Sequence, residues 1–352
     1  MSIRSADDYY PWFDWLRLVA ATVVVLSHLG DFARWPRAGE FAVRVFFALS
    51  GWLIGGILIK LPRHELPRFY FNRALRIWCP YLLALFLLVS VSLSRDHITS
   101  KWTETVFYMG TFVFNIFGLR QIALYRFQMP LEGTGSHFWS VNAEEQFYLL
   151  APLVLVLMPR RISRSLVVWV GVAFLALWSH IYASIVLGVL AVVIAHKFPA
   201  LFRDWRYRGV AALLVLASAI GLFAGADYEL ASPFCALGIV LLLSAKGARH
   251  RWGEIAGGMS YPLYLNAWIA MFLVNFVAKR SRLVPPITHD ALAVAMSFAL
   301  AVTMYWFIDR QILAQRSKLF SVPRARMVMI AAYSSVALGI CIGILLYHRG
   351  GL

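Results

Sequence analysis

Long apolar runs, separated by short polar segments, recur from one end of the chain to the other. Many of them approach the roughly 20 residues that a helix needs to cross a bilayer core about 30 Å thick. Eleven such runs lie at about 12–29, 41–60, 77–94, 143–158, 165–178, 180–196, 209–225, 229–245, 258–277, 290–309 and 326–347. The pattern predicts an all-α fold, a polytopic transmembrane helical bundle of about 10–11 spans. We expect one membrane domain over 1–352, with no separate soluble domain.

The composition supports a membrane protein. Hydrophobic residues make up 61% of the 352 residues, charged residues only 14%, and the mean hydropathy is +0.70. An ordinary soluble domain is about 45–50% apolar and about 25% charged. The first apolar run is not followed by a small-residue cleavage site, so we expect it to be a retained span rather than a signal peptide.

The net charge of +16 raises the question of a nucleic-acid partner, but the basic residues lie in the loops. If the N-terminus is cytoplasmic, 21 of the 33 Lys and Arg residues fall on the cytoplasmic side, where such residues are normally enriched. We therefore expect a lipid bilayer as the partner and no nucleic acid. The three cysteines have no metal-ligand spacing, so we expect no metal site.

An arginine and a histidine lie in the first apolar run, "DWLRLVAATVVVLSH". Arg17 and His28 are eleven residues apart, and eleven helical steps of 100° end about 20° past three full turns. The two side chains therefore share one helix face, about 16 Å apart along the axis. A snorkelling arginine and a packing histidine are the alternatives. The shared face favours a functional pair, because intramembrane charges usually face a bundle interior.

A second group of polar residues begins the fourth run, in "SHFWSVNAEEQFYLLAP". Ser140 and Glu144 lie one helical turn apart, and so do Glu145 and Tyr148. The simple interpretation is a helix start, with Ser140 as the N-cap and the two acids complementing the helix dipole. The functional alternative is that a carboxylate orients His28 and stabilises its charged form during proton transfer.

A pair of arginines, Arg73 and Arg76 in "NRALRIWCPY", shares one face just before the third run. One explanation is that the two arginines anchor the third span at the cytoplasmic side of the membrane. The alternative is a phosphate-rich ligand, because guanidinium groups bind phosphate in a bidentate manner.

Five motifs occur in order along about 250 residues, within a core of about 12–310. They are R-x10-H from Arg17 to His28 preceded by Asp14, "VFFALSGWLI", "RALRIWCPY", "FWSVNAEEQFYLLAP" and "GGMSYPLYL". In these motifs the chain resembles the acyltransferase-3 family of bacterial membrane O-acyltransferases.

The resemblance implies a multi-pass enzyme of the bacterial inner membrane that moves an acyl group, commonly acetyl from acetyl-CoA, to a hydroxyl of a carbohydrate. Such acceptors include lipopolysaccharide and exopolysaccharide. It implies that Arg17, His28 and Glu144 are catalytic, with His28 acting as general base or carrying the acyl group. Acyl-CoA as co-substrate is assigned to Arg17, Ser50, Arg73 and Arg76. Acceptor-binding side chains are expected at Asp14, His137, Trp139, Ser140, Glu145 and Tyr148.

The chain departs from the family pattern at two places. Asn266 stands where many members have a histidine after "SYPLYL", and "DRQ", Asp309 to Gln311, replaces a Glu-Arg-Pro-like element. The role of the late histidine is therefore open in this chain.

The long segment 95–142 is expected to face outward and to select the acceptor, because long loops are often functional and this one contains aromatic residues. The competing function is a transporter or flippase for a glycan or an anion. That class usually shows repeat symmetry, which the sequence lacks. An inactive regulatory partner is the third possibility. The sequence leaves open the acceptor, the choice between acetyl and succinyl, and the oligomeric state.

Overall fold

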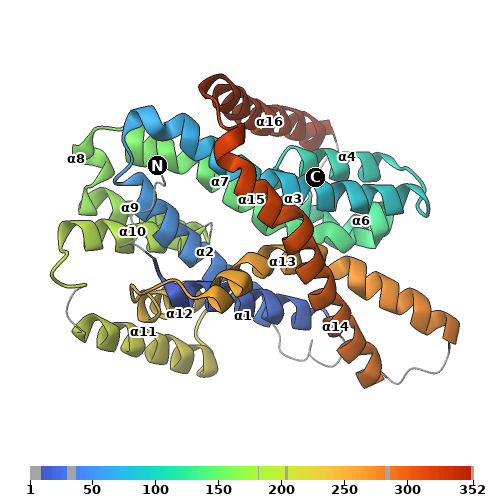
Figure 1. The fold of residues 1–352 in the computed structure, drawn as a ribbon, viewed down its shortest axis with the longest axis horizontal. Helices are drawn as coiled ribbons and strands as arrows, with labels where there is room; N and C mark the ends of the chain where they lie inside the picture. The colour runs from blue at the N-terminus through green and yellow to red at the C-terminus, as the bar shows by residue number, and fades with distance from the viewer. Residues whose placement is uncertain (1–8, 30–36, 181, 203–204, 282–285, 350–352) are drawn as a thin grey trace. The chain divides into compact units, whose positions relative to one another are not determined.

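The computed structural model describes residues 9–29, 37–180, 182–202, 205–281 and 286–349, and all the regular elements that these residues form are helices (Figure 1). The chain divides into two compact units. The first unit comprises Met1–Leu61 and Leu153–Val302, and the second comprises Pro62–Pro152 and Thr303–Leu352. The longer helices are α1 (Pro11–Ser27), α2 (Ala38–Leu58), α3 (Leu66–Leu93), α4 (Ser100–Gly110), α7 (Trp139–Pro152), α9 (Leu166–Ser179), α10 (Ala183–Lys197), α11 (Arg206–Phe223), α12 (Tyr228–Leu242), α13 (Arg251–Ser281), α14 (Pro286–Met304), α15 (Arg310–Leu319) and α16 (Val322–Arg349).

The predicted all-α, polytopic architecture is confirmed. Among the described residues, six helices are long and apolar enough to cross a membrane: Ala38–Leu58, Arg63–Leu93, Arg206–Phe223, Arg251–Val277, Thr288–Leu319 and Val322–Leu346. Three shorter apolar helices are Leu166–Ser179, Ala183–Lys197 and Tyr228–Leu242. The largest change from the predicted bounds is at α3, which begins at Leu66 rather than near 77. Its early turns carry arginines, which lower the hydropathy but do not prevent a helical backbone, and Pro67 fits a first turn.

Close backbone approach organises the first unit. There α2 packs against α10 and α12, and α1 packs against α13 and α2 (Figure 1). A Cβ atom at Gly51 would lie 2.1 Å from the Ile185 carbonyl oxygen, and one at Gly188 would lie 2.4 Å from the Ala48 carbonyl oxygen. Small residues at these positions therefore let α2 and α10 approach, as is usual between membrane helices.

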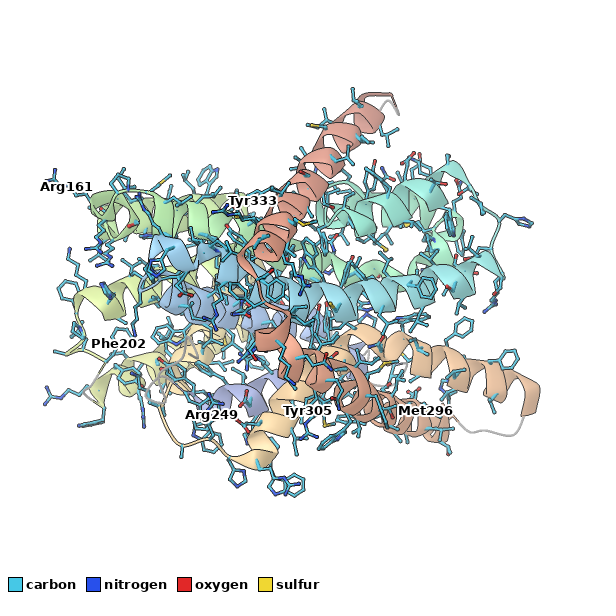
Figure 2. The ribbon with its side chains drawn as sticks, turned by 45° about the horizontal axis from the view of Figure 1, so that its top comes forward. Arg161, Phe202, Arg249, Met296, Tyr305 and Tyr333 are labelled. Atoms are coloured by element: carbon cyan, nitrogen blue, oxygen red, sulfur yellow. The ribbon has the colours of Figure 1, made fainter. Side chains whose placement is uncertain are left out.

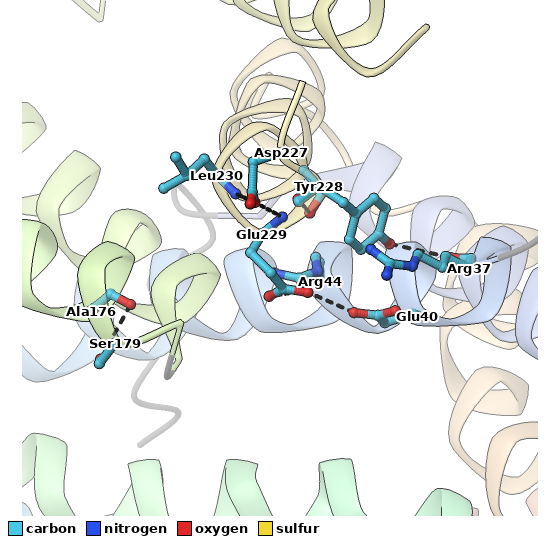
Figure 3. A network of polar contacts seen from close by, with 10 residues as sticks. Arg37, Glu40, Arg44, Ala176, Ser179, Asp227, Tyr228, Glu229 and Leu230 are labelled. Atoms are coloured by element: carbon cyan, nitrogen blue, oxygen red, sulfur yellow. Dashed lines mark hydrogen bonds and ion pairs between the residues drawn. The ribbon is translucent and has the colours of Figure 1, made fainter. Parts of the chain in front are cut away.

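An ion-pair network joins the first turns of α2 and α12 (Figure 3). Nη2 of Arg44 donates to Glu40 at 2.8 Å and to Glu229 at 2.6 Å. The guanidinium carbon of Arg44 also lies 4.9 Å from the ring centre of Tyr228, and that of Arg37 lies 4.6 Å from it. The network therefore fixes the two helix starts to each other through charges that compensate one another.

The second unit is organised around α3, which packs against α15 and α16. Tyr333, labelled on α16 in Figure 2, donates to the Leu149 carbonyl at 2.8 Å and lies 2.7 Å from the Tyr70 hydroxyl. A G-x-x-x-G stripe on α16 also packs within this unit, because Cβ atoms at Gly339 and Gly343 would clash with Thr111 and Phe117. Three segments far apart in sequence are thus joined through α3, α7 and α16.

The segment 95–142 is folded into short helical pieces rather than an extended loop. These include α4, α5 (Phe114–Phe117), α6 (Ile122–Tyr125), the 3-10 helix η6 (Pro130–Phe138) and the start of α7. Asp96 accepts from the Leu131 amide at 2.7 Å and from the Ser92 hydroxyl at 2.5 Å, and the Trp102 indole donates to Ser92 at 2.7 Å. Leu131, at φ 47, takes a left-handed conformation that this bond to Asp96 stabilises. Local polar contacts thus order the segment against α3.

We expect Gly51→Ala to lower the stability of the protein by about 1–3 kcal/mol, since the new methyl group would overlap the α10 backbone. Thermal unfolding in detergent, followed by size-exclusion chromatography, measures the effect. Gly56→Ala is the matched control on the same helix, because a Cβ there meets nothing within 4 Å and alanine favours helix by about 0.5–1 kcal/mol. Equal stability of the two variants would contradict the close approach of α2 and α10.

Candidate functional site

The first polar cluster of the candidate site lies at the start of α1. Nη1 of Arg17 donates to Oδ1 of Asp14 at 3.0 Å, with the two side chains only 16% and 13% exposed. The Tyr9 hydroxyl donates to the other Asp14 oxygen. Burial and this carboxylate raise the pKa of Tyr9, so the hydroxyl keeps its proton and remains a donor. The sequence analysis named Arg17 and Asp14 for separate roles, and the structure joins them as an ion pair.

The same cluster brings α13 onto α1. The Gly247 amide donates to the Tyr9 carbonyl at 3.0 Å, and the guanidinium carbon of Arg249 lies 5.2 Å from the centre of the Tyr9 ring. A Cβ atom at Gly257 would lie 2.4 Å from Oδ1 of Asp14. Gly257, in the "GGMSYPLYL" motif, therefore leaves the space that the Asp14 carboxylate occupies. The two motifs meet in the fold.

His28 lies one residue beyond the end of α1, and its side chain is exposed. Its Nδ1 atom lies 2.7 Å from the Val24 carbonyl oxygen. A carbonyl oxygen only accepts, so the hydrogen of the neutral ring is on Nδ1 and the lone pair is on Nε2. A backbone carbonyl of α1 thus sets the tautomer, whereas one of the two interpretations of the sequence gives the orientation of His28 to a carboxylate.

Arg17 lies in the second turn of α1 and His28 lies just beyond its last residue, so the two are separated along the helix axis. That their side chains share one face stays a prediction. The backbone leaves the helix at His28, with φ −98 and ψ 0, and the ring turns back toward Val24. Glu144, the proposed partner of His28, belongs to the second unit. A contact between His28 and Glu144 therefore stays a prediction.

The second polar cluster lies in the second unit, around the two arginines of α3. Arg73 faces the Glu145 carboxylate, and its guanidinium carbon lies 5.3 Å from the ring centre of Tyr148. Glu145 is only 4% exposed, and its Oε2 atom accepts no hydrogen bond within the described structure. The Trp78 indole nitrogen is also buried without a hydrogen-bond partner there, and it lies beside this carboxylate. Glu145 is therefore a buried acid near Arg73 rather than a surface acid that complements the helix dipole.

Arg76 has its own acidic neighbour. Asp309 lies within electrostatic reach of Arg76 and is 8% exposed. It ends the π-helix η8 (Tyr305–Asp309), which packs on α3. A π-helical turn inserts an extra residue and is frequently found at functional sites. The sequence analysis noted Asp309 only as a departure from the family pattern, because the distance in sequence hides its proximity to α3.

The polar residues at the start of α7 are paired differently from the sequence prediction. Tyr148 donates to Glu144 at 3.1 Å, not to Glu145. Ser140 is not the N-cap, because α7 begins at Trp139, and its hydroxyl donates to the His137 carbonyl at 3.5 Å. The preceding 3-10 helix runs directly into α7, so this end has no separate capping residue.

Three other predicted residues occupy ordinary positions in their units. The His137 ring lies 4.4 Å from the Phe138 ring, and Nδ1 of His137 lies 3.3 Å from the Thr134 carbonyl oxygen. Trp139 begins α7, and Ser50 lies on α2 next to Gly51. Ser50 belongs to the first unit and the arginine pair to the second, so a common donor site for them stays a prediction.

A buried amide network that the sequence analysis missed holds α7 in place. Asn142 accepts from the Phe114 amide at 3.0 Å and donates to the Tyr81 hydroxyl at 2.9 Å. One turn later, Gln146 donates to the Phe112 carbonyl at 2.7 Å and to Asn115 at 2.8 Å. The sequence contains a sign of this network, because the amides of Asn142 and Gln146 are four residues apart and share one face of the helix. Glu145 is held in the core by these neighbours.

Comparison with known proteins assigns the family. The sequence model of a family described as "Acyltransferase domain" matches residues 10–306, and the chain belongs to this acyltransferase family. The match includes Asp14, Arg17, Arg73, Arg76 and Glu145, while Tyr9 and Asp309 lie just outside it. Together with its apolar helices, this makes the chain a multi-pass membrane protein of that family.

The curated relatives cover only part of the chain. It is 31% identical over 178 residues to the O-acetyltransferase OatA of Staphylococcus aureus strain NCTC 8325 / PS 47 and, to the same extent, to that of strain COL. These matches cover 45% of this chain and 27% of each relative. The chain therefore spans less than a third of the length of these relatives. No solved structure matches the chain significantly.

We expect Gly257→Ala to disrupt the Tyr9–Asp14–Arg17 cluster, because its methyl group would occupy the position of the Asp14 carboxylate. A loss of about 1–3 kcal/mol in stability, measured by thermal unfolding in detergent, is the expected result. Gly253→Ala on the same helix is the control, since the nearest atom to its Cβ, Nε1 of Trp15, lies 3.5 Å away. A Gly257→Ala variant as stable as Gly253→Ala would show that Asp14 does not depend on this space.

Proposed function

We propose that this chain is a membrane O-acetyltransferase, which moves an acetyl group from acetyl-CoA to a hydroxyl of a cell-surface or exported carbohydrate. The observation that carries the proposal is the acyltransferase family match over residues 10–306, which includes the helix of Arg17 and His28. The name of the OatA relatives supports acetyl transfer to oxygen.

The proposed reaction moves one proton in two steps, from the acceptor hydroxyl to His28 and from His28 to the leaving group. Nε2 of His28 takes the proton from the acceptor hydroxyl as its oxygen attacks the thioester carbonyl. The C–O bond forms, the C–S bond breaks, and the proton passes to the sulfur of the departing CoA. The tautomer set by the Val24 carbonyl supports this role, because it leaves a lone pair on Nε2 without help from another side chain. The same lone pair also suits transient acyl transfer to His28.

The donor is proposed to bind through its phosphates to arginines. Arg73 and Arg76 are the candidates, with Arg17 and Ser50 closer to the thioester. The neighbouring acids Glu145 and Asp309 support a role in which they hold the guanidinium groups in place until phosphate arrives. Glu144 remains a candidate catalytic acid, and the Tyr148 hydroxyl bond orients its carboxylate.

The proposed location is a bacterial inner membrane with the N-terminus in the cytoplasm. The distribution of basic residues between the loops supports this orientation. Acyl-CoA would then approach from the cytoplasm, and the acceptor would be reached from the opposite side.

We expect His28→Ala to abolish acetylation, because general base catalysis contributes about 10²–10⁴-fold in rate. Alkali-labile acetyl esters on surface polysaccharide, measured by mass in a deletion strain that carries each variant, report the activity. His64→Ala, at a histidine whose side chain is 79% exposed, is the control and should acetylate normally. Full acetylation by His28→Ala would reject His28 as the proposed base. If the polysaccharide has the same mass with and without the wild-type protein, the result would favour transport.

We expect Glu145→Gln to reduce acetyl transfer at least as strongly as Glu144→Gln. Glu145 is buried beside Arg73, and neutralising it leaves the guanidinium without its counter-charge. Acetyl-ester yield, normalised to the amount of inserted protein, compares the two variants. A wild-type yield of acetyl esters from Glu145→Gln would show that the Glu145 carboxylate only complements the helix dipole.

A further inference from the structure

A polar trio outside both clusters lies where α13 and α14 meet in the first unit. Nε2 of His289 lies 2.8 Å from Oδ1 of Asn275, and Nδ1 of His289 lies 3.1 Å from Oδ1 of Asp290. Both ring nitrogens thus face acceptor oxygens, so the imidazole is fixed in orientation by residues on two helices. Asp290 is 8% exposed, the His289 side chain is 22% exposed, and Asn275 is exposed.

The trio interrupts an apolar surface. Leu273, Phe276 and Val277, which flank Asn275 on α13, are large exposed hydrophobic residues. Polar groups among membrane-facing apolar side chains are costly, and they are most often retained where they bind a substrate or an ion. Beside the trio, a small apolar cluster that includes Val274 and Ala293 also joins α13 to α14.

Those apolar contacts also bring the end of α1 to the trio. Leu29, Val274 and Ala293 form one buried cluster, with Leu26, Met271 and Val294 packed against it. His28 precedes Leu29, Asn275 follows Val274, and Asp290 lies one helical turn before Ala293. The proposed base and the trio therefore border the same apolar contact.

We propose that Asn275, His289 and Asp290 form a binding site for the hydroxyl-rich acceptor beside His28, an assignment that rests on the proposed acetyl transfer. Sugar hydroxyls both donate and accept hydrogen bonds. The Asn275 amide nitrogen can donate and the Asp290 carboxylate can accept, while His289 holds these two groups in position. The trio binds hydroxyls next to the reacting one, while Nε2 of His28 takes the transferred proton. The trio belongs to the first unit, whereas the segment 95–142, which the sequence predicts to select the acceptor, belongs to the second unit.

The test separates acceptor binding from donor binding. Membranes containing each variant are given radiolabelled acetyl-CoA and surface polysaccharide purified from the deletion strain, and the label in alkali-labile esters is measured while one substrate is varied. Asn275→Ala and His289→Gln should each raise the half-saturating polysaccharide concentration about tenfold, the scale of one lost hydrogen bond to a charged or polar partner. The half-saturating acetyl-CoA concentration should stay within about twofold, since the trio does not contact the donor.

Ser179→Ala, at an exposed polar residue at the end of α9 in the same unit, is the matched control and should resemble wild type. Unchanged polysaccharide dependence in both trio variants would overturn the site, and so would a rise in the half-saturating acetyl-CoA concentration alone. If one trio variant no longer inserts into the membrane, the other variant and Asp290→Asn are tested instead. They are judged by the same two half-saturating concentrations, for polysaccharide and for acetyl-CoA. Absence of ester label with the wild-type protein would instead reject the proposed acetyl transfer.

Discussion

The cost of placing charges within apolar helices is the constraint on which this structure depends. Inserting an arginine or an aspartate at a bilayer centre costs about 2.5–3.5 kcal/mol on insertion scales, and a buried charge without a partner costs more. Four arginines within the long helices accordingly lie near acids. Arg17 bonds to Asp14, and Arg44 bonds to Glu40 and Glu229. Arg73 and Arg76 face Glu145 and Asp309.

These charge pairs also determine which helices meet. Arg44 ties the start of α2 to α12, while Asp309 brings the π-helix η8 to α3. Close packing at glycines makes such contacts possible, as at Gly51 against α10 and at Gly257 against Asp14. Without a hydrophobic driving force between helices in lipid, small residues and polar bonds carry the specificity of packing.

The cost of an unpaired charge also distinguishes the two ends of α1. At its start, Arg17 is held by Asp14 under a tyrosine that remains a donor. At its end, His28 is exposed, and its Nδ1 atom lies 2.7 Å from the Val24 carbonyl oxygen and 3.4 Å from the Ser27 hydroxyl. A compensated cation and an available imidazole nitrogen suit binding at one end and proton transfer at the other, in line with the proposed acetyl transfer.

Apolar runs and isolated charges are local properties, so the sequence alone predicts the helical class, the membrane character and the arginines of both polar clusters. It also placed Arg17 and His28 at two depths of one helix through helical spacing. The partners of those residues were decided only by the tertiary structure. Asp309 comes to Arg76 across more than 200 residues, and Glu145 rather than Glu144 turns into the core because the Asn142 and Gln146 amides fix the rotation of α7. Hydropathy cannot predict such contacts. It measures whether a segment prefers an apolar environment, and it does not identify the neighbour that packs against it.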